Sequence, residues 1–367
     1  MTPVDLSTTV LHAVRRAVRE DALHAPVPAR VRVERTRPGG RGDYASAVAL
    51  QLAGPAGLAA REVAEILRDR LAGAPGVAGV EITGPGFLNF TLDAATGAAA
   101  HRDLVHRVRE QGERYGYGDA LAGQRVRLVH AREVRAAVTA DAVRRLLAAQ
   151  GAAVRVSCAG EPDADWARLG VSAEAYEREH AEAPADAPGE PPAPLRPVPA
   201  GDTTAVLLAR LGPDAARWGL LRAAGHDRAP LGPELIAQTE ANALFRVRYA
   251  HARARALVRE AGRLGVTVAG PGEDIDTAGA DTLLTLLDAH PAVLAAAALH
   301  RAPDRLARHL EAVAAAFFDF HDAAHPLPAG DEKPSAAHRS RTALAEAAGT
   351  VLAGGLSLLG VSAPEHL

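Results

Sequence analysis

The fold is decided by residues 125–157, RVRLVHAREVRAAVTADAVRRLLAAQGAAVRVS. Alternating apolar residues over 125–130 and 153–157 predict two strands, and the apolar spacing over 134–150 predicts a helix between them. A strand, a helix and a strand in this order form a parallel βαβ unit with a right-handed crossover. A single unit of this kind is only a fragment of a nucleotide-binding sheet.

The composition excludes the disordered, membrane and secreted classes of protein. The chain has 367 residues, 48% hydrophobic and 23% charged, which is the balance of a globular protein. No apolar run of about 18 residues is free of charges and helix breakers, so we predict no membrane span. Arg15, Arg16 and Arg19 precede any long apolar run, unlike in a secretory signal. Cys158 is the one cysteine and cannot form an internal disulfide, so we expect a cytoplasmic protein.

Few side chains in the sequence offer reactive chemistry. Lys333 is the single lysine among 41 basic residues, which excludes any mechanism that needs a lysine elsewhere. His321 and His325 have the spacing of a metal pair on one helix turn, but no third ligand is evident and we predict no metal. Cys158 has no histidine near it in the sequence, and we interpret it as a buried structural thiol.

Charge is unevenly distributed along the chain. Residues 15–41 contain eight arginines and three acids, and residues 244–264 contain six arginines and one acid. Between them, residues 161–190 contain nine acids and two arginines. Two basic ends around an acidic middle favour an anionic partner that is bound at both ends. The alternative interpretation is solvated surface charge.

Residues 1–95 predict an α+β unit. Glycines at 84 and 86 flank Pro85 and predict a tight turn between its last two strands. The predicted helices cover 6–20, 44–52 and 59–71, and the predicted strands cover 31–33, 77–82 and 87–92.

The rest of the chain divides into three parts. Residues 96–181 contain a helix at 101–111 and the βαβ unit, and residues 182–202 contain seven prolines, which predicts an extended linker. Residues 203–367 predict an all-α bundle. Its helices are expected at 203–211, 213–224, 231–264, 280–299, 302–322 and 335–360. The predicted fold class is multidomain: an α+β domain, a truncated βαβ (Rossmann-like) remnant and an all-α helical bundle.

Several motifs resemble those of arginyl-tRNA synthetases. Residues 42–52 (GDYASAVALQL) and 84–90 (GPGFLNF) are similar to the N-terminal additional domain of that family. Residues 211–217 (LGPDAAR) resemble the Asp-Ala-Leu-Arg (DALR) signature that opens its anticodon-binding helical domain. The order of these motifs, at both ends of the chain, makes the resemblance specific.

Further residues near the end of the chain fit the same helical domain. They are Asn242, residues 249–253 (YAHAR) and residues 359–365 (LGVSAPE). The resemblance implies an arginyl-tRNA synthetase N-terminal-like domain over 1–95, a remnant of the class I catalytic domain over 96–181, a Pro-rich linker over 182–202, and a DALR-type anticodon-binding domain over 203–367. It also leads us to expect that Asp214 and Arg217 fix helix geometry by pairing.

The middle of the chain departs from the family pattern. The helix over 133–147 resembles the helix that follows the family's His-x-Gly-His motif, but the tetrapeptide is absent. Glu133 stands near the place of its last histidine, and His130 is the only histidine close by. The family's Lys-Met-Ser-Lys-Ser loop cannot exist, because Lys333 lies in the helical domain. Adenylate formation depends on positive groups that stabilise charge on a phosphate, so we expect no catalysis and no cofactor.

Phe87 and Asn89 are the candidate RNA-binding residues of the N-terminal domain. They lie two apart on a predicted strand, so their side chains share a face. A ring beside an amide can stack on a base and hydrogen-bond its edge. In the family the matching positions hold a base of the tRNA D-loop. The alternative is a core phenylalanine and an asparagine that caps a turn.

A second set of candidates lies on the predicted helix around 242–264. Its apolar residues fall on one arc, and arginines cluster on the opposite side. Such a row suits a phosphate backbone, and a tyrosine offers a stacking face. The candidates are Asn242, Arg248, Tyr249, Arg255, Arg259 and Arg263. The alternative is a solvated arginine face.

We therefore interpret the chain as a non-catalytic relative, similar to the short ArgS-related anticodon-binding proteins of the NrtL kind. The resemblance implies tRNA of the arginine type as the partner, and neither DNA nor a membrane. Two alternatives stay open. The chain is an active arginine–tRNA ligase, or it is an interaction module for another protein such as a true synthetase.

Overall fold

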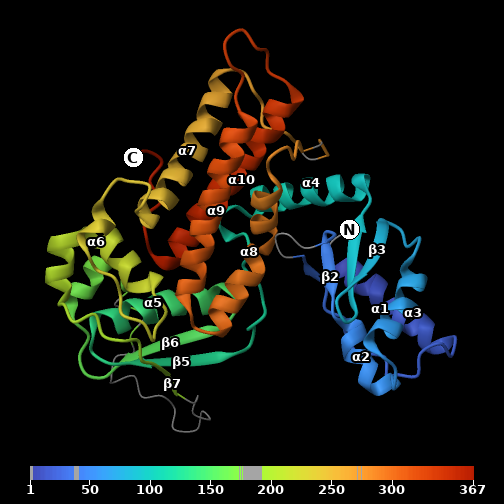
Figure 1. Cartoon of the computed structure of the whole chain (residues 1–367). Coiled ribbons are helices and arrows are strands. Elements are labelled where there is room, and N and C mark those ends of the chain that lie inside the picture. Colours follow the sequence, from blue (N-terminus) through green and yellow to red (C-terminus); the bar gives the residue numbers. More distant parts are fainter. Residues whose placement is uncertain are drawn as a thin grey trace. The chain divides into compact units, whose positions relative to one another are not determined.

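The computed structural model describes residues 3–36, 41–172, 174, 176, 192–270, 272–273 and 275–367. The chain forms two compact units, Met1–Asp103 and Leu104–Leu367 (Figure 1). The second unit contains both the predicted βαβ remnant and the predicted helical bundle. These two regions share one hydrophobic core, in which Leu128 and Val143 belong to the same cluster as Leu310 and Leu352.

The first unit is a four-stranded antiparallel sheet with helices packed on it. The sheet has the order β1-β2-β4-β3, from Glu34–Arg35, Tyr44–Ser46, Phe87–Leu92 and Val77–Thr83 respectively. The helices are α1 (Pro3–Arg19), α2 (Val48–Ala56) and α3 (Ala60–Leu71). Leu88 and Phe90 of β4 are fully buried in one core with Leu6 and Leu67 of the helices. Because side chains alternate along a strand, Phe87 and Asn89 lie on the opposite face of the sheet.

The helix predicted over 44–52 is partly wrong. Its first residues form strand β2, in which Tyr44 pairs with Phe90 of β4, and α2 begins only at Val48. Gly42 (φ +72°) lies against the Phe90 carbonyl, where a Cβ atom would meet that oxygen at 2.6 Å. This close approach ties the segment to β4. Pairing with a distant strand therefore overrides the local helical spacing.

The second unit contains a three-stranded parallel sheet of order β6-β5-β7. The predicted βαβ unit is confirmed as β5 (Arg125–His130), α5 (Val134–Ala149) and β6 (Ala153–Cys158). Strand β7 (Pro192–Leu195) pairs in parallel with β5, although these residues fall in the predicted linker. Ala193 and Leu195 point into the core and alternate with exposed prolines, a pattern that an edge strand tolerates. Residues 182–191 of the predicted linker lie outside the described residues.

Helices make up the remainder of the second unit. The helices predicted over 203–211 and 213–224 are the two halves of α6 (Thr204–Arg222), which breaks at Gly212 (φ 73°, ψ 173°). The helix predicted over 231–264 is too long, because α7 begins at Ala243. The short 3₁₀ helix η2 covers Ala164–Leu169, and η4 covers Pro233–Ile236. Helix α4 covers Ala94–Gln111, so it begins in the first unit and ends in the second. The remaining helices are α7 (Ala243–Arg263), α8 (Asp281–Leu299), α9 (Pro303–Ala324) and α10 (Ala336–Leu359).

Two of these helices, α8 and α10, are long and apolar enough to cross a membrane by length and composition. Most of α10 is buried in the molecule, where it packs against α7 and α9, and α8 packs against α9. Buried core helices pass the same test of composition. The helices therefore give only weak support for a membrane span.

Candidate nucleic-acid interface

Asn242 forms the N-cap of α7 and is buried. Its side-chain oxygen accepts a hydrogen bond from the Leu244 amide at 3.0 Å. Its side-chain nitrogen donates to the carbonyls of Leu235 at 2.9 Å and Ala237 at 2.8 Å. Both ends of the amide are thus used to begin α7 and to hold η4 beside it. These hydrogen bonds give Asn242 a structural role that does not require contact with RNA.

Tyr249 lies at the centre of an aromatic surface formed by α7 and α9. Its side chain is 44% exposed, and its ring stacks on Phe245 of α7 and on Phe318 of α9, with ring centroids 5.6 Å apart in both pairs. Neither phenylalanine was among the residues singled out in the sequence. Phe245 lies four residues before Tyr249, a spacing that places them on one face and could have revealed it. Phe318 comes from a distant helix and has no such signal.

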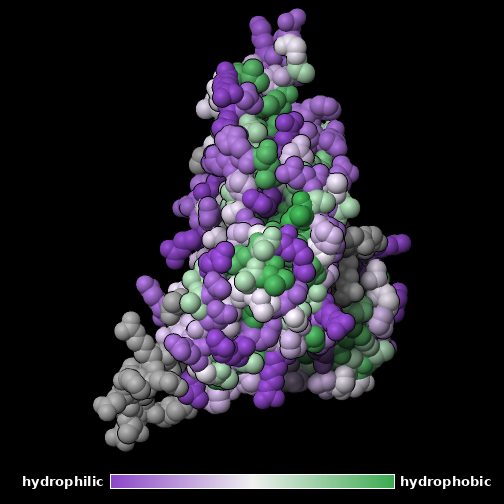
Figure 2. Space-filling view, turned by 90° about the vertical axis from the view of Figure 1, so that its left-hand side faces the viewer, coloured by the Kyte–Doolittle hydropathy of each residue, from purple (hydrophilic) through white to green (hydrophobic). Residues whose placement is uncertain are grey.

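Beyond Tyr249 the same pair of helices carries polar side chains. Arg253, one turn after Tyr249 on α7, donates to Nε2 of His321 on α9 at 3.3 Å, and Nδ1 of His321 lies 3.1 Å from Asp322. These residues line a cavity of about 400 Å³ with Leu257 and His325. Figure 2 shows the side of the molecule on which α6 and α7 lie, with apolar patches among mostly hydrophilic atoms. The surface therefore combines rings with neighbouring cations.

The arginine row predicted on α7 exists, but each of its four members has an acidic partner. The pairs are Arg248 with Asp214 at 3.6 Å, Arg255 and Arg259 with Glu365 at 3.0 and 3.4 Å, and Arg263 with Glu260. Hydrogen bonds from Arg255 and then its charge lower the pKa of Glu365 below its usual range. Asp214 and Glu365 come from α6 and from the end of the chain, so the helical pattern alone could not predict them, whereas Glu260 lies three residues before Arg263 on α7 itself.

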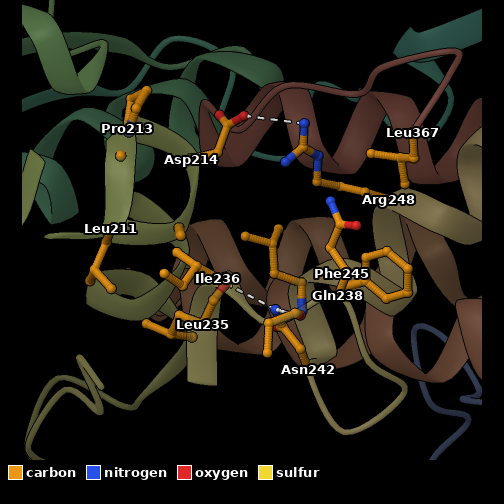
Figure 3. A pocket seen from close by; sticks show the side chains of 14 residues that line it. Leu211, Pro213, Asp214, Leu235, Ile236, Gln238, Asn242, Phe245, Arg248 and Leu367 are labelled. Atoms are coloured by element: carbon orange, nitrogen blue, oxygen red, sulfur yellow. Dashed lines mark hydrogen bonds and ion pairs between the residues drawn. The ribbon is translucent and has the colours of Figure 1, made fainter. Parts of the chain in front are cut away.

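A second pocket, of about 270 Å³, lies at the first turns of α7 (Figure 3). Arg248, Phe245 and Leu367 lie at one side of it and Leu211 and Pro213 at the other. The break of α6 at Gly212 shapes the second side. The pocket therefore joins three segments that are far apart in the sequence.

Asp214 and Arg217 both pair, as predicted, but not with each other. Asp214 accepts hydrogen bonds from the backbone and side chain of Ser362 and pairs with Arg248. Arg217 is fully buried and pairs with Asp141 of α5. Although the two residues are only three positions apart on α6, their side chains therefore contact different parts of the chain.

On the N-terminal unit, the structure brings Phe87 and Asn89 to one face of the sheet. Phe87 is 39% exposed, whereas Asn89 is only 6% exposed. The Asn89 side-chain nitrogen donates to the Thr83 hydroxyl at 2.7 Å across the β3–β4 hairpin. Phe87 is thus free to meet a ligand with its ring, while the amide nitrogen of Asn89 is used within the hairpin.

The end of β5 lies where the family motif would be expected. His130 is 2% exposed, its Nε2 lies 3.1 Å from the Tyr176 hydroxyl, and its ring is 5.8 Å from that of Trp166. Burial lowers the pKa of His130, so the ring is neutral near pH 7. Glu133 caps α5: one carboxylate oxygen accepts from the Ala136 amide at 2.9 Å and the other from the Ala200 amide at 2.8 Å. A carboxylate therefore occupies the helix N-terminus, which otherwise attracts anions.

Comparison with known families gives two matches at the two ends of the chain. Residues 5–92 match the family described as "Arginyl tRNA synthetase N terminal domain". Residues 247–367 match the family described as "DALR anticodon binding domain". The fold and these matches define a protein with the N-terminal α+β domain, parallel-sheet remnant and helical DALR domain of an arginyl-tRNA synthetase-like architecture.

The chain belongs to the arginyl-tRNA synthetase family. It is similar to the arginine–tRNA ligase of Frankia alni, with 30% identity over 556 aligned positions covering 100% of both chains, and to that of Renibacterium salmoninarum, with 29% over 553 and the same coverage. Since this chain has 367 residues, at least 189 of the 556 positions lie opposite gaps in it.

Solved structures agree at the level of the fold. The arginyl-tRNA synthetase of Thermus thermophilus matches with a TM-score of 0.65 at 14% identity, covering 100% of both chains. That of Plasmodium falciparum matches with a TM-score of 0.65 at 8% identity, covering 100% of this chain and 99% of the other.

Proposed function

We propose that this chain is a tRNA-binding member of the arginyl-tRNA synthetase family that does not form an aminoacyl adenylate. Its ligand is tRNA of the arginine type, bound by the N-terminal unit and by the α7–α9 surface. The observation that carries the proposal is the exposed Tyr249 ring, which packs beside Phe245 and Phe318 and lies inside the segment that matches an anticodon-binding family.

The aromatic surface suits unpaired bases. Base–ring stacking contributes about 1–3 kcal/mol per base and does not depend on the identity of the base. Phe245 and Phe318 hold the Tyr249 ring in place, so little side-chain entropy is lost when a base stacks on it. Arg253 lies one turn away and offers a cation for the adjoining phosphate. Arg246 adds a second cation, for which the described part of the chain records no acidic partner.

The N-terminal unit supplies the second contact. Phe87, 39% exposed at the start of β4, stacks on a splayed base in this proposal. Asn89 contributes through its side-chain oxygen, because its nitrogen is bonded to Thr83. We assign Asn242 to helix capping rather than to RNA contact.

The side chains at the end of β5 disfavour adenylate chemistry. Glu133 places a negative charge at the N-terminus of α5 and would repel the phosphates of ATP. His130 is neutral and enclosed by Trp166 and Tyr176, so it has no access to a nucleotide. With Lys333 as the only lysine of the sequence, no second lysine can neutralise a reacting phosphate.

A binding titration with a transcript of arginine tRNA tests the proposal. We expect specific binding that weakens as salt is added, with log K falling linearly in log salt. Phe87→Ala and Tyr249→Ala each lower the affinity, whereas a tRNA-sized RNA hairpin without a D-loop loses the Phe87 dependence. No affinity for tRNA at low ionic strength overturns the proposal.

An arginine–tRNA ligase is the second candidate function. It is favoured by relatives with that name that align over 100% of this chain. An ATP–pyrophosphate exchange assay with arginine and tRNA separates the two candidates. Exchange that depends on arginine establishes the ligase; no exchange alongside tight tRNA binding supports the first proposal. Co-purification of a protein that survives nuclease and high salt would instead support an interaction module.

A further inference from the structure

Residues 361–367 lie along the outer side of α7 and are held there at several points. Val361 is buried, and the Ser362 amide donates to Asp214 at 2.9 Å. The carbonyl of Pro364 lies 3.0 Å from Nδ1 of His251, which is itself 4% exposed. The segment is therefore anchored near its start by α6 and in its middle by α7.

Glu365 makes the outermost contacts of this segment. Arg255 donates to one carboxylate oxygen through Nε at 3.1 Å and through a terminal nitrogen at 3.0 Å. Arg259, one turn later, donates to the other oxygen and to the Glu365 carbonyl, both at 3.4 Å. Two arginines of one helix thus hold a single carboxylate from both sides.

Past this point the chain turns to the pocket at the start of α7. Leu367 lies in its wall beside Phe245 and Arg248 (Figure 3). Its side chain keeps 55% of its surface exposed, so packing alone does not hold it there. Glu365, two residues earlier, is held by hydrogen bonds from Arg255 and Arg259.

We propose that Arg255, Arg259 and Glu365 form a clasp that positions residues 362–367 as one wall of the RNA-binding surface. Arg255 and Arg259 are positioning residues in this proposal, and they act on RNA through the segment and not through phosphates. The inference rests on the proposed function. It replaces the expectation that these two arginines contact the RNA backbone.

The variant Glu365→Gln should change the tRNA affinity in opposite directions, depending on whether Arg255 and Arg259 bind phosphates or form the clasp. If the arginines bound phosphates, removing the competing charge would free them and strengthen tRNA binding. In the clasp, Glu365→Gln weakens binding about 3- to 10-fold, because two charge-assisted contacts are lost. Arg255→Gln weakens it similarly without a change in the salt slope, which would fall by about 0.7–0.9 for a lost phosphate contact. Arg168→Gln, whose partner Asp165 lies three residues before it in η2, is the matched control for an exposed ion pair and leaves the affinity unchanged.

Two further measurements complete the experiment. The exchanged pair Arg255→Glu with Glu365→Arg restores part of the affinity lost in either single variant. Hydrogen exchange of the peptide covering 361–367 becomes faster in Glu365→Gln and stays as in the wild type in Arg168→Gln. Unchanged exchange, or stronger tRNA binding by Glu365→Gln, overturns the clasp. A wild-type protein that binds no tRNA overturns the proposed function, while the exchange measurement still decides whether the clasp orders the segment.

Discussion

Arg217 of α6 pairs with Asp141 of α5, and solvent is excluded from both side chains, which are 0% and 1% exposed. The same guanidinium donates to the carbonyls of Leu359 and Leu169, so its donors are shared among three segments. Arg144 and Arg145 approach the Asp141 carboxylate at 3.0 Å. One buried charge pair thus joins the sheet remnant to the helical part.

Breaking this pair is expected to destabilise the second unit strongly. Asp141→Asn leaves Arg217 buried without its charge partner, at a cost of about 3–5 kcal/mol. Urea unfolding followed by circular dichroism measures the loss. The exposed pair Arg168–Asp165 provides the control, since Asp165→Asn is expected to cost at most about 1 kcal/mol. Equal effects at the two sites would contradict a joint role for Arg217.

Two buried histidines predict a loss of stability in mild acid. Burial lowers the pKa of His290 to about 3 and that of His309 to about 4, and their rings lie 5.2 Å apart. Below pH about 6.5 these two histidines bind protons in the unfolded chain but not in the folded chain. The free energy of unfolding therefore falls as the pH is lowered toward the folded-state pKa values. The expected loss between pH 7 and pH 5 is about 3–4 kcal/mol for the pair.

The measurement is the free energy of unfolding in urea across this pH range. His290→Phe preserves the stacking on Tyr115 and removes one titrating group, so the pH dependence should shrink by about half. His226→Asn, at a position whose side chain is 85% exposed, should leave it unchanged. Asp141 acts at lower pH: burial raises its pKa, but the charges of Arg217 and Arg145 outweigh this and lower it, so its contribution is lost only below pH about 4.

The sequence predicts local elements well and distant pairings poorly. The βαβ unit and the break of α6 at Gly212 follow from periodicity and from glycine, because their causes lie within a few residues. Strand β7 was missed because prolines indicate a linker, whereas the pairing of Ala193 and Leu195 with β5 is tertiary.

The candidate interface shows the same limit. Tyr249 was identified from its motif, but Phe318 stacks on it from another helix. Glu365 neutralises Arg255 from 110 positions away, and no helical pattern contains that information. Partners that are distant in the sequence therefore determine which of the predicted residues remain available to a ligand.

Removing the central ring of the aromatic surface should weaken tRNA binding. Tyr249→Ala is expected to lower the affinity about 5- to 150-fold, because it deletes a stacking face that contributes about 1–3 kcal/mol. Tyr249→Phe keeps the face and should change the affinity less than about 3-fold. Tyr117→Ala, at another tyrosine with 37% exposure, is the control in a filter-binding titration. An affinity that is equal in Tyr249→Ala and wild type would remove this surface from the interface.

Substitutions of Glu133 test whether this residue at the end of β5 has a structural role and no role in nucleotide binding. Glu133→Ala removes the acceptor for both the Ala136 and Ala200 amides, and the lost cap should cost about 1–2 kcal/mol in urea unfolding. Glu133→Gln keeps an acceptor but loses the charge at the helix N-terminus, so it should cost less, about 0.3–1 kcal/mol. Neither variant should gain arginine-dependent pyrophosphate exchange, because Trp166 and Tyr176 still enclose His130. If Glu133→Ala instead left stability unchanged and bound ATP, Glu133 would control access to a functional nucleotide site, and the end of β5 would be able to support adenylate formation.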